Sequence, residues 1–195
     1  RAHPTTLAHY VLTFVQPMGR DLDRLQSAYN RTNKSPAGAG STNGSRLPID
    51  RDRLAELLGF NGLVLHTRDA MWQSDGPIEL MSAALAVLCN VDHLTEDLQI
   101  WATSEFNFVE LSDSHSRSSV IMPQKKNPYS LTFVRGVARE MIGRLAGTAA
   151  LQSTPSGQVD NRIFTYSMVP KGLMQTKLAL KLLSATVSGL TVNKD

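Results

Sequence analysis

Residues 116–128 gather, in one short polar segment, side chains that could do chemistry. The sequence SRSSVIMPQKKNP holds three serine hydroxyls, an arginine and two adjacent lysines. Asn127 followed by Pro128 is the pattern of a helix N-cap and first helical residue. A helix start exposes N–H donors and a partial positive charge, so with the cations it predicts an anion site. A hydroxyl there could react if that field lowers its pKa, and the alternative is a solvated loop with a good cap.

The elements that must position this segment are helices. Apolar residues recur in steps of three and four over 7–29, with a kink expected at Pro17. The turn-rich stretch 35–45 ends that helix, and a short helix capped by Asp50 is closed by Gly59. The apolar patch 63–65 could pass for a short strand.

The longest predicted helix starts at Pro77 and continues to about Phe108. Its first half is apolar on nearly every face, so it needs neighbours on most sides, and the residues concerned are Ile78, Met81, Leu85, Leu88 and Val91. After a polar loop over 110–127, helix 128–152 follows, and a last helical region is expected to be interrupted at Pro170. No alternating strand run or repeat occurs, so the sequence predicts an all-α fold, a bundle of long helices.

Composition excludes several classes of protein. The 195 residues, 42% hydrophobic and 19% charged, have an ordinary globular balance. The net charge of +3 is scattered, which argues against nucleic-acid binding, and no apolar run reaches the roughly 18–20 residues of a membrane span. Cys89 is the only cysteine, so no internal disulfide or thiolate metal site can form, which fits a cytoplasmic protein. The chain begins at Arg1 without methionine or a signal-peptide pattern, and we expect a piece of a longer protein.

The segment SSVIMPQKKNP closely resembles the signature of the fumarase/aspartase superfamily, commonly written SSxxMPxKxN. Its QKKNP form is most similar to the argininosuccinate lyase branch. Three further stretches resemble that branch in order and spacing: RAHPTTLAHY at 1–10, SPAGAGSTNGSRLPIDRDRLAELLGF at 35–60 and EFNFVELSDSHS at 105–116. The resemblance extends to about Gly147 and weakens beyond it.

This resemblance implies a fold and a reaction. Members of the superfamily that the sequence resembles are homotetramers whose central domains form a bundle of long helices. Each of their active sites is built from three subunits. They cleave a C–N or C–O bond by anti β-elimination and release fumarate or a close analogue. Residues 1–195 would be the central domain with parts of its edges, without the N-terminal and small C-terminal domains. We expect a dicarboxylate or amino-acid substrate, no cofactor, no metal, no nucleic acid and no membrane.

Residue by residue, Ser118 matches the catalytic base, which takes the proton next to the succinyl carboxylate. A serine hydroxyl is a weak base, so its alkoxide needs strong local stabilisation, for which Lys125, Arg117 and nearby N–H groups are candidates. Lys125 matches the lysine that binds the substrate carboxylate, and Asn127 matches the asparagine that orients it. A cation aimed at the developing aci-carboxylate stabilises the transition state more than the ground state.

Further candidates follow from the same match. Ser119 and Met122 fall at positions that line the site, and Arg117 and Thr5 are additional substrate-binding candidates. Thr5 and its neighbour could instead cap the first helix. Lys126 is expected to be a solvated charge.

The sequence also departs from the family pattern. A Thr-His pair normally precedes the position of Arg1, and Thr132 stands where a glutamate usually partners that histidine. Arg117 stands where a glycine usually precedes the two serines. Residues 73–77 differ from the argininosuccinate lyase pattern, and in the stretch 159–164 only Asn161 and Arg162 match it.

These departures leave more than one function open. The leading hypothesis is a C–N lyase that eliminates an amine from an N-substituted aspartate to give fumarate. Argininosuccinate lyase proper and an ethylenediamine-disuccinate lyase are alternatives in the same class. A catalytically silent structural relative, resembling the lens δ-crystallins, is an alternative from another class.

Overall fold

The computed structural model describes residues 2–155, 160 and 162–194, and within them the chain is predominantly helical. The helices are α1 (Leu7–Leu12), α2 (Val15–Thr32), α3 (Arg51–Leu57), α4 (Thr67–Trp72), α5 (Asp75–Trp101), α6 (Tyr129–Ala150) and α7 (Arg162–Ser188). One 3-10 turn, η1 (Asp113–His115), and four two-residue strands accompany them: β1 (Val109–Glu110), β2 (Arg117–Ser118), β3 (Lys126–Asn127) and β4 (Thr191–Val192). The predicted all-α bundle is confirmed.

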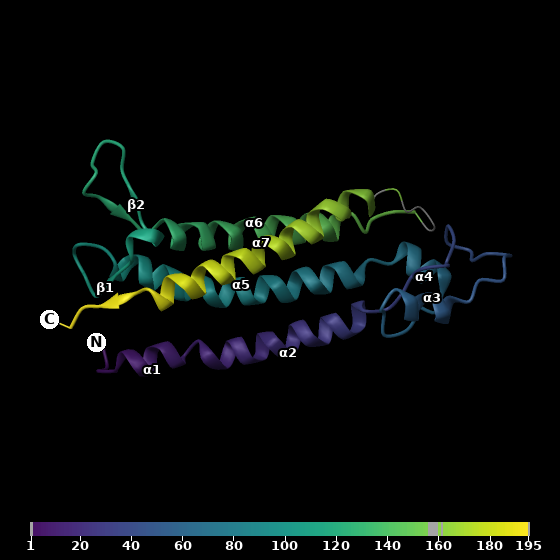
Figure 1. The fold of residues 1–195 in the computed structure, drawn as a ribbon, viewed down its shortest axis with the longest axis horizontal. Helices are drawn as coiled ribbons and strands as arrows, with labels where there is room; N and C mark the ends of the chain where they lie inside the picture. The colour runs from purple at the N-terminus through teal and green to yellow at the C-terminus, as the bar shows by residue number, and fades with distance from the viewer. Residues whose placement is uncertain (1, 156–159, 161, 195) are drawn as a thin grey trace.

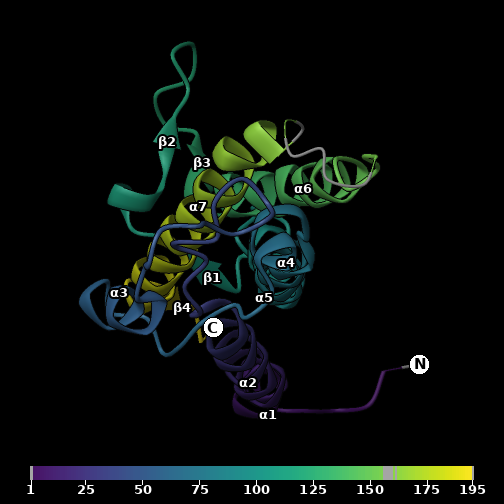
Figure 2. The ribbon, with the colours of Figure 1, turned by 90° about the vertical axis from the view of Figure 1, so that its right-hand side faces the viewer.

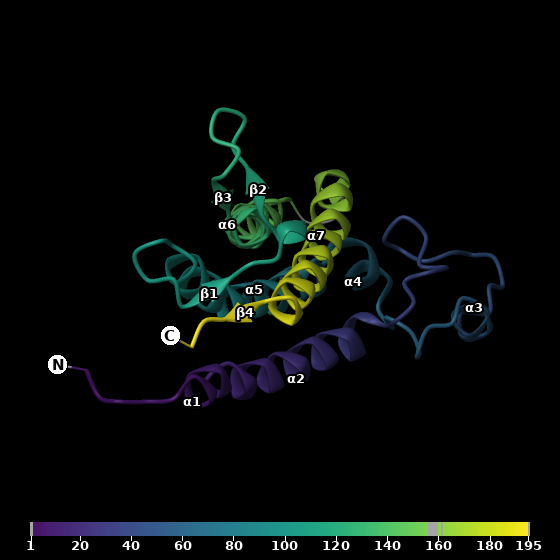
Figure 3. The same ribbon diagram turned by 60° about the vertical axis from the view of Figure 1, so that its left-hand side comes forward.

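Four long helices lie side by side along the longest axis of the molecule (Figure 1). Helix α5 is central and packs against α2, α6 and α7, while α6 and α7 also pack on each other. Seen end-on, α2 lies on one side of α5, with α6 and α7 on the other (Figure 2). The described ends of the chain and the β2–β3 hairpin lie at one end of the bundle, and α3 and α4 lie at the other (Figure 3).

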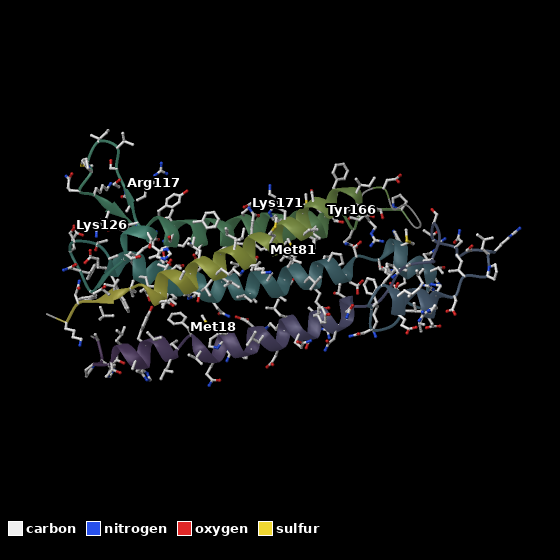
Figure 4. All side chains as sticks on the ribbon, in the orientation of Figure 1. Met18, Met81, Arg117, Lys126, Tyr166 and Lys171 are labelled. Atoms are coloured by element: carbon white, nitrogen blue, oxygen red, sulfur yellow. The ribbon has the colours of Figure 1, made fainter. Side chains whose placement is uncertain are left out.

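The hydrophobic core follows α5. Met81, Leu88 and Val91 are fully buried in one cluster with side chains from α6 and α7, and Met18 packs against it from α2 (Figure 4). The central residues of this helix therefore have the predicted neighbours on most sides, and a single chain supplies them. Three neighbouring helices of the same chain surround them, because a largely apolar helix is stable at the centre of a bundle.

By length and hydropathy, α5 is also the one helix among the described residues that could cross a membrane. Eight of its side chains are buried within the bundle: Met81, Ala83, Ala84, Val87, Leu88, Val91, Thr95 and Leu98. A central helix of a packed bundle has this same composition.

Helix α5 ends at Trp101 and does not continue to Phe108 as predicted. The Thr103 hydroxyl donates to the Ile100 carbonyl at 2.7 Å, and the Phe108 N–H donates back to the Trp101 carbonyl at 2.9 Å. Side-chain hydroxyls that bond nearby carbonyls compete with the next helical turn. The chain therefore folds back and brings β1 alongside the end of the bundle.

The predicted kink at Pro17 and the predicted interruption at Pro170 are both wrong. Residues 7–29 form two helices that divide at Thr13 and Phe14, and Pro17 lies in the first turn of α2, where its missing N–H is tolerated. Pro170 lies inside α7, which runs through it without the expected interruption. Its neighbours Val169 and Leu173 pack against the core cluster, and that packing offsets the loss of one backbone hydrogen bond.

Local capping signals were confirmed where they were strongest. Asp50 accepts a hydrogen bond from the Arg53 N–H at 2.9 Å, and Gly59 adopts φ +78° just beyond α3. Helix α4 was not predicted, and patch 63–65 forms only an isolated bridge between Ser35 and Leu63.

A close approach of helices at Gly172 gives a stability prediction. A Cβ atom at this buried position of α7 would lie 3.1 Å from Met81 Cε and 3.3 Å from Met141 Cε. Gly172→Leu should therefore lower the free energy of unfolding by about 1–3 kcal/mol through overpacking. Denaturant titration measures the effect, with Gly136→Ala as the control, because nothing lies within 4 Å of a Cβ there. The control should be neutral or stabilising, and equal losses in both variants would contradict the close packing.

Candidate active site

The signature segment folds into a hairpin that projects from the end of the bundle (Figure 1). Strands β2 and β3 are antiparallel, with Arg117 opposite Asn127 and Ser118 opposite Lys126. Ser118 is exposed, and its side chain shares a face of the ribbon with that of Lys126, because paired residues of a ladder point the same way.

The loop between the strands is organised by local hydrogen bonds. The Ser119 hydroxyl accepts from the N–H groups of Ile121 and Met122, both at 3.3 Å. The Lys125 N–H donates to the Met122 carbonyl at 3.0 Å and closes a turn. At the tip, Val120 is 96% exposed and Ile121 is 89% exposed, so this chain leaves two apolar side chains in solvent.

Lys126 anchors the base of the hairpin (Figure 4). Its ammonium lies 2.8 Å from Glu110 Oε1 and 2.8 Å from Asp113 Oδ1. The hydrogen bond with Lys126 lowers the pKa of Asp113, and the bonds to Asp113 and Glu110 raise the pKa of Lys126. Lys126 is thus exposed to solvent, as expected, and it also forms two surface ion pairs that were not predicted.

Arg117 and Asn127 lie opposite each other in the hairpin and both make contacts near the start of α6. The Arg117 guanidinium lies 5.5 Å from the ring centroid of Tyr129, a cation–π contact with the start of α6. Asn127 Nδ2 donates to the Arg117 carbonyl at 3.1 Å. The predicted N-cap at Asn127 is wrong, because α6 begins at Tyr129 after Pro128, without a side-chain cap. The asparagine belongs to β3 instead.

A polar pocket of about 610 Å³ lies beside the hairpin, between the end of α5 and the start of α6. Lys125 and Asn127 both line it, together with Gln99. No ion pair or side-chain hydrogen bond of Lys125 occurs within the part of the chain that the structure describes. A pocket of this volume suits a small polar ligand, and the Lys125 ammonium is available to an anion.

The remaining predicted residues lie elsewhere. Arg117, Ser118, Ser119 and Met122 are on the hairpin, outside the lining of this pocket. Thr5 lines a second, more apolar pocket of about 300 Å³. The structure thus brings Lys125 and Asn127 together and leaves Ser118 and Thr5 apart from them in a single chain.

Three aromatic side chains contribute to the lining of the second pocket. Tyr10, Trp101 and Phe108 line it, and Thr6 rather than Thr5 caps α1 by accepting from the His9 N–H at 3.2 Å. Burial raises the pKa of the Tyr10 hydroxyl, and its hydrogen bond to Asp97 raises it further. This tyrosine is therefore protonated and acts as a donor.

At the far end of the bundle, Arg162 donates to the Met71 carbonyl and thereby joins α7 to α4. Val159 and Asn161, which belong to the same compared stretch, lie outside the described residues, as does Arg1. No group of three or more potential metal ligands gathers among the residues that are described.

Sequence reasoning missed a polar chain beside the first pocket. Gln99 of α5 bonds both Arg135 and Thr132 of α6, at 2.6 and 2.7 Å. The spacing of Asp92, Glu96 and Gln99 on one face of a helix was the available signal for a polar seam. The partner helix was not predictable from that spacing alone.

Comparison with known proteins identifies the family to which the chain belongs. Residues 1–143 match the family model described as Lyase. The chain is 34% identical over its whole length to the argininosuccinate lyase of Methanococcoides burtonii, covering 40% of that protein. It is 42% identical over 151 residues to the argininosuccinate lyase of Arthrospira platensis, a match that covers 77% of this chain and 32% of that one.

A solved structure is similar throughout. The crystal structure of EDDS lyase in complex with formate matches with a TM-score of 0.88 and 31% identity, over 98% of this chain and 38% of that one. A probable argininosuccinate lyase of Schizosaccharomyces pombe is 37% identical, with all of this chain aligned to 43% of that protein. The chain thus spans between 32% and 43% of the length of these curated relatives. It belongs to the lyases of the fumarase/aspartase superfamily, in the argininosuccinate lyase-like branch.

Proposed function

We propose that the protein containing this chain is a carbon–nitrogen lyase that releases fumarate from an N-substituted aspartate by anti β-elimination. The observation that carries the proposal is the folded signature segment, which brings Lys125 and Asn127 into one polar pocket beside the hairpin of Ser118. In this proposal, residues 1–195 are the central bundle domain, and the N-terminal and small C-terminal domains are further parts of the protein. The lone, exposed Cys89 fits a cytoplasmic location.

The proposed chemistry assigns each residue a step. Ser118, as alkoxide, takes the proton from the carbon next to the substrate carboxylate, and that carboxylate gains charge as an aci-carboxylate. Lys125 supplies the compensating charge, and Asn127 donates a hydrogen bond to the same group. The electron pair of the broken C–H bond then forms the C=C bond of fumarate as the C–N bond breaks. The substrate nitrogen enters the reaction protonated, so it keeps its proton, takes the electron pair of the broken C–N bond and leaves as the neutral amine.

We propose that the active site is completed by other copies of the chain in a homotetramer. In one chain the Arg117 guanidinium lies over Tyr129 and Lys126 pairs with two carboxylates, and within the described residues neither cation forms a hydrogen bond with the Ser118 hydroxyl. The hairpin tip also leaves Val120 and Ile121 in solvent, as expected of a surface that meets a partner. Groups from a second chain would provide the missing stabilisation of the alkoxide.

The identity of the released amine is the next question for the proposed reaction. An N-succinyl amine satisfies the proposal, and the relatives are named for argininosuccinate and for EDDS. Residues 159–164 match the argininosuccinate lyase pattern only at Asn161 and Arg162, and residues 73–77 depart from it. We therefore favour an amine other than arginine, and keep argininosuccinate as the runner-up.

The test follows fumarate at 240 nm with the full-length protein and a panel of N-substituted aspartates. The panel contains argininosuccinate, ethylenediamine disuccinate and simple N-alkyl aspartates. Turnover of any member supports the proposal and identifies the leaving amine. A folded protein that is inactive on every member would favour the structural, δ-crystallin-like alternative.

The two adjacent lysines should differ strongly in their effect on catalysis. Lys125→Met should lower kcat/KM by about 10²–10³, because it removes a preorganised charge from the substrate carboxylate. Lys126→Met should have a much smaller effect, since Glu110 and Asp113 already neutralise Lys126. Steady-state kinetics on the same preparation measures both. Similar losses would mean that the lysines act as a diffuse patch.

A further inference from the structure

A chain of hydrogen bonds crosses from α6 to α5 and back at the wall of the first pocket. Arg135 Nη1 donates to Gln99 Oε1 at 2.6 Å, and Gln99 Nε2 donates to Thr132 Oγ1 at 2.7 Å. The Thr132 hydroxyl donates in turn to the Pro128 carbonyl at 3.2 Å. Arg135, Gln99 and Thr132 lie outside residues 116–128, and only the Pro128 carbonyl belongs to the signature segment.

The two hydrogen-bond partners of Gln99, Arg135 and Thr132, require the same orientation of its amide. A guanidinium can only donate, so the amide oxygen must face Arg135. The Thr132 hydroxyl has one proton, which the Pro128 carbonyl takes, so its oxygen accepts from the amide NH₂. The assignment of nitrogen and oxygen in Gln99 is therefore determined by its partners.

Arg135 is itself held in place. Its Nη2 lies 2.7 Å from Glu96 Oε1, and its Nε lies 3.4 Å from Asp92 Oδ1. Arg135 is only partly exposed, and its planar guanidinium meets three acceptors on one face of α5. A lysine could not satisfy the same three acceptors in one plane.

The Gln99 amide retains one unused donor. Its NH₂ group has two protons, and Thr132 is the single acceptor it meets within the described residues. Gln99 lines the pocket that Lys125 and Asn127 also line. An amide N–H, a lysine ammonium and an asparagine amide in one pocket are donors suited to a carboxylate.

We propose that Gln99 is a carboxylate-binding residue of this pocket and that Arg135 is the positioning residue that keeps its NH₂ group available. The inference rests on the proposed function for the identity of the ligand, which is a dicarboxylate. It adds the Gln99 amide to Lys125 and Asn127 as a third donor in the first pocket. Thr132 stands where the family usually has a glutamate, and its neutral hydroxyl accepts the hydrogen bond from Gln99. A glutamate at this position would place a negative charge next to the bound anion.

The experiment measures fumarate binding to the full-length protein by isothermal titration calorimetry, independently of turnover. Gln99→Glu is the main variant, because it keeps the shape and the contact with Arg135 but replaces the donor by an oxygen. We expect the Kd for fumarate to rise about 10-fold or more, as for the loss of a hydrogen bond to a charged group. Gln26→Glu, on the exposed face of α2, is the matched control and should leave the Kd unchanged.

A second pair of variants tests the positioning role. Arg135→Lys should raise the Kd for fumarate without changing the circular dichroism spectrum, whereas Arg139→Lys should not raise it. Arg139 shares Asp92 with Arg135 but makes no bond to Gln99. Equal effects of the two arginine variants would overturn the positioning role, since they would report only the loss of packing or charge.

The inference and the proposed function fail in distinguishable ways. Unchanged fumarate affinity in Gln99→Glu, or no fumarate binding by the wild type, would overturn the inference even if the protein is an active lyase. Weaker binding in Gln99→Glu would support it even if no N-substituted aspartate is turned over.

Discussion

Replacing Ser118 with alanine in the full-length protein is expected to abolish fumarate release and leave the assembly intact. The substitution removes only the hydroxyl that we propose takes the proton from the substrate. Ser118 is exposed on β2, and its side chain makes no hydrogen bond within the described residues. Its ladder partner Lys126 is held by Glu110 and Asp113. The folded bundle should therefore be unchanged.

The measurement is single-turnover and steady-state fumarate release at 240 nm, with mass from light scattering on the same sample. Ser114→Ala is the matched control, because Ser114 is also exposed and lies just before the hairpin. Its hydroxyl lies 2.9 Å from the Ser112 hydroxyl. Ser114→Ala should retain full activity. Activity of Ser118→Ala within threefold of wild type would exclude Ser118 as the base.

The sequence predicted features that depend on neighbours in the chain. Asp50 and Gly59 bound α3 as expected, because capping and a positive φ are set within a few residues. The long apolar helix that begins near Pro77 was also predictable, since its composition admits few alternatives. The signature segment identified the family because its residue types and spacing are unusual for a connecting loop.

Features that depend on distant partners were not predictable. Asn127 looked like a helix cap, but its amide closes a hairpin with Arg117, ten residues away. Lys126 is exposed as predicted, but its two ion pairs were not predicted, because nothing local indicates that Glu110 and Asp113 fold back onto it. A local pattern gives the type of a side chain, and only the tertiary fold decides which partner competes for it.

The second large expected effect is the loss of subunit assembly. Replacing a buried and an exposed leucine with aspartate should distinguish effects on folding from effects on association. Leu88 is fully buried in the core of one chain, whereas Leu178 of α7 is 53% exposed. Leu88→Asp should lower the free energy of unfolding by at least about 3 kcal/mol, because it buries a carboxylate in an apolar core. Thermal unfolding followed by circular dichroism measures this loss, so Leu88 reports on the fold of the bundle.

Leu178→Asp should leave the bundle folded and dissociate the proposed homotetramer. Its neighbour Met174, one turn away on α7, is 59% exposed, so the two form an apolar strip that no other part of the described chain covers. Burial of such a strip between copies is the usual reason for its presence, and a carboxylate there would be desolvated in the interface. Light scattering should show a smaller particle, and fumarate release should fall with it, because each proposed site needs groups from other chains. A wild-type protein that is monomeric and fully active would contradict both the shared site and the tetramer, since one chain alone keeps Ser118 apart from the pocket of Lys125.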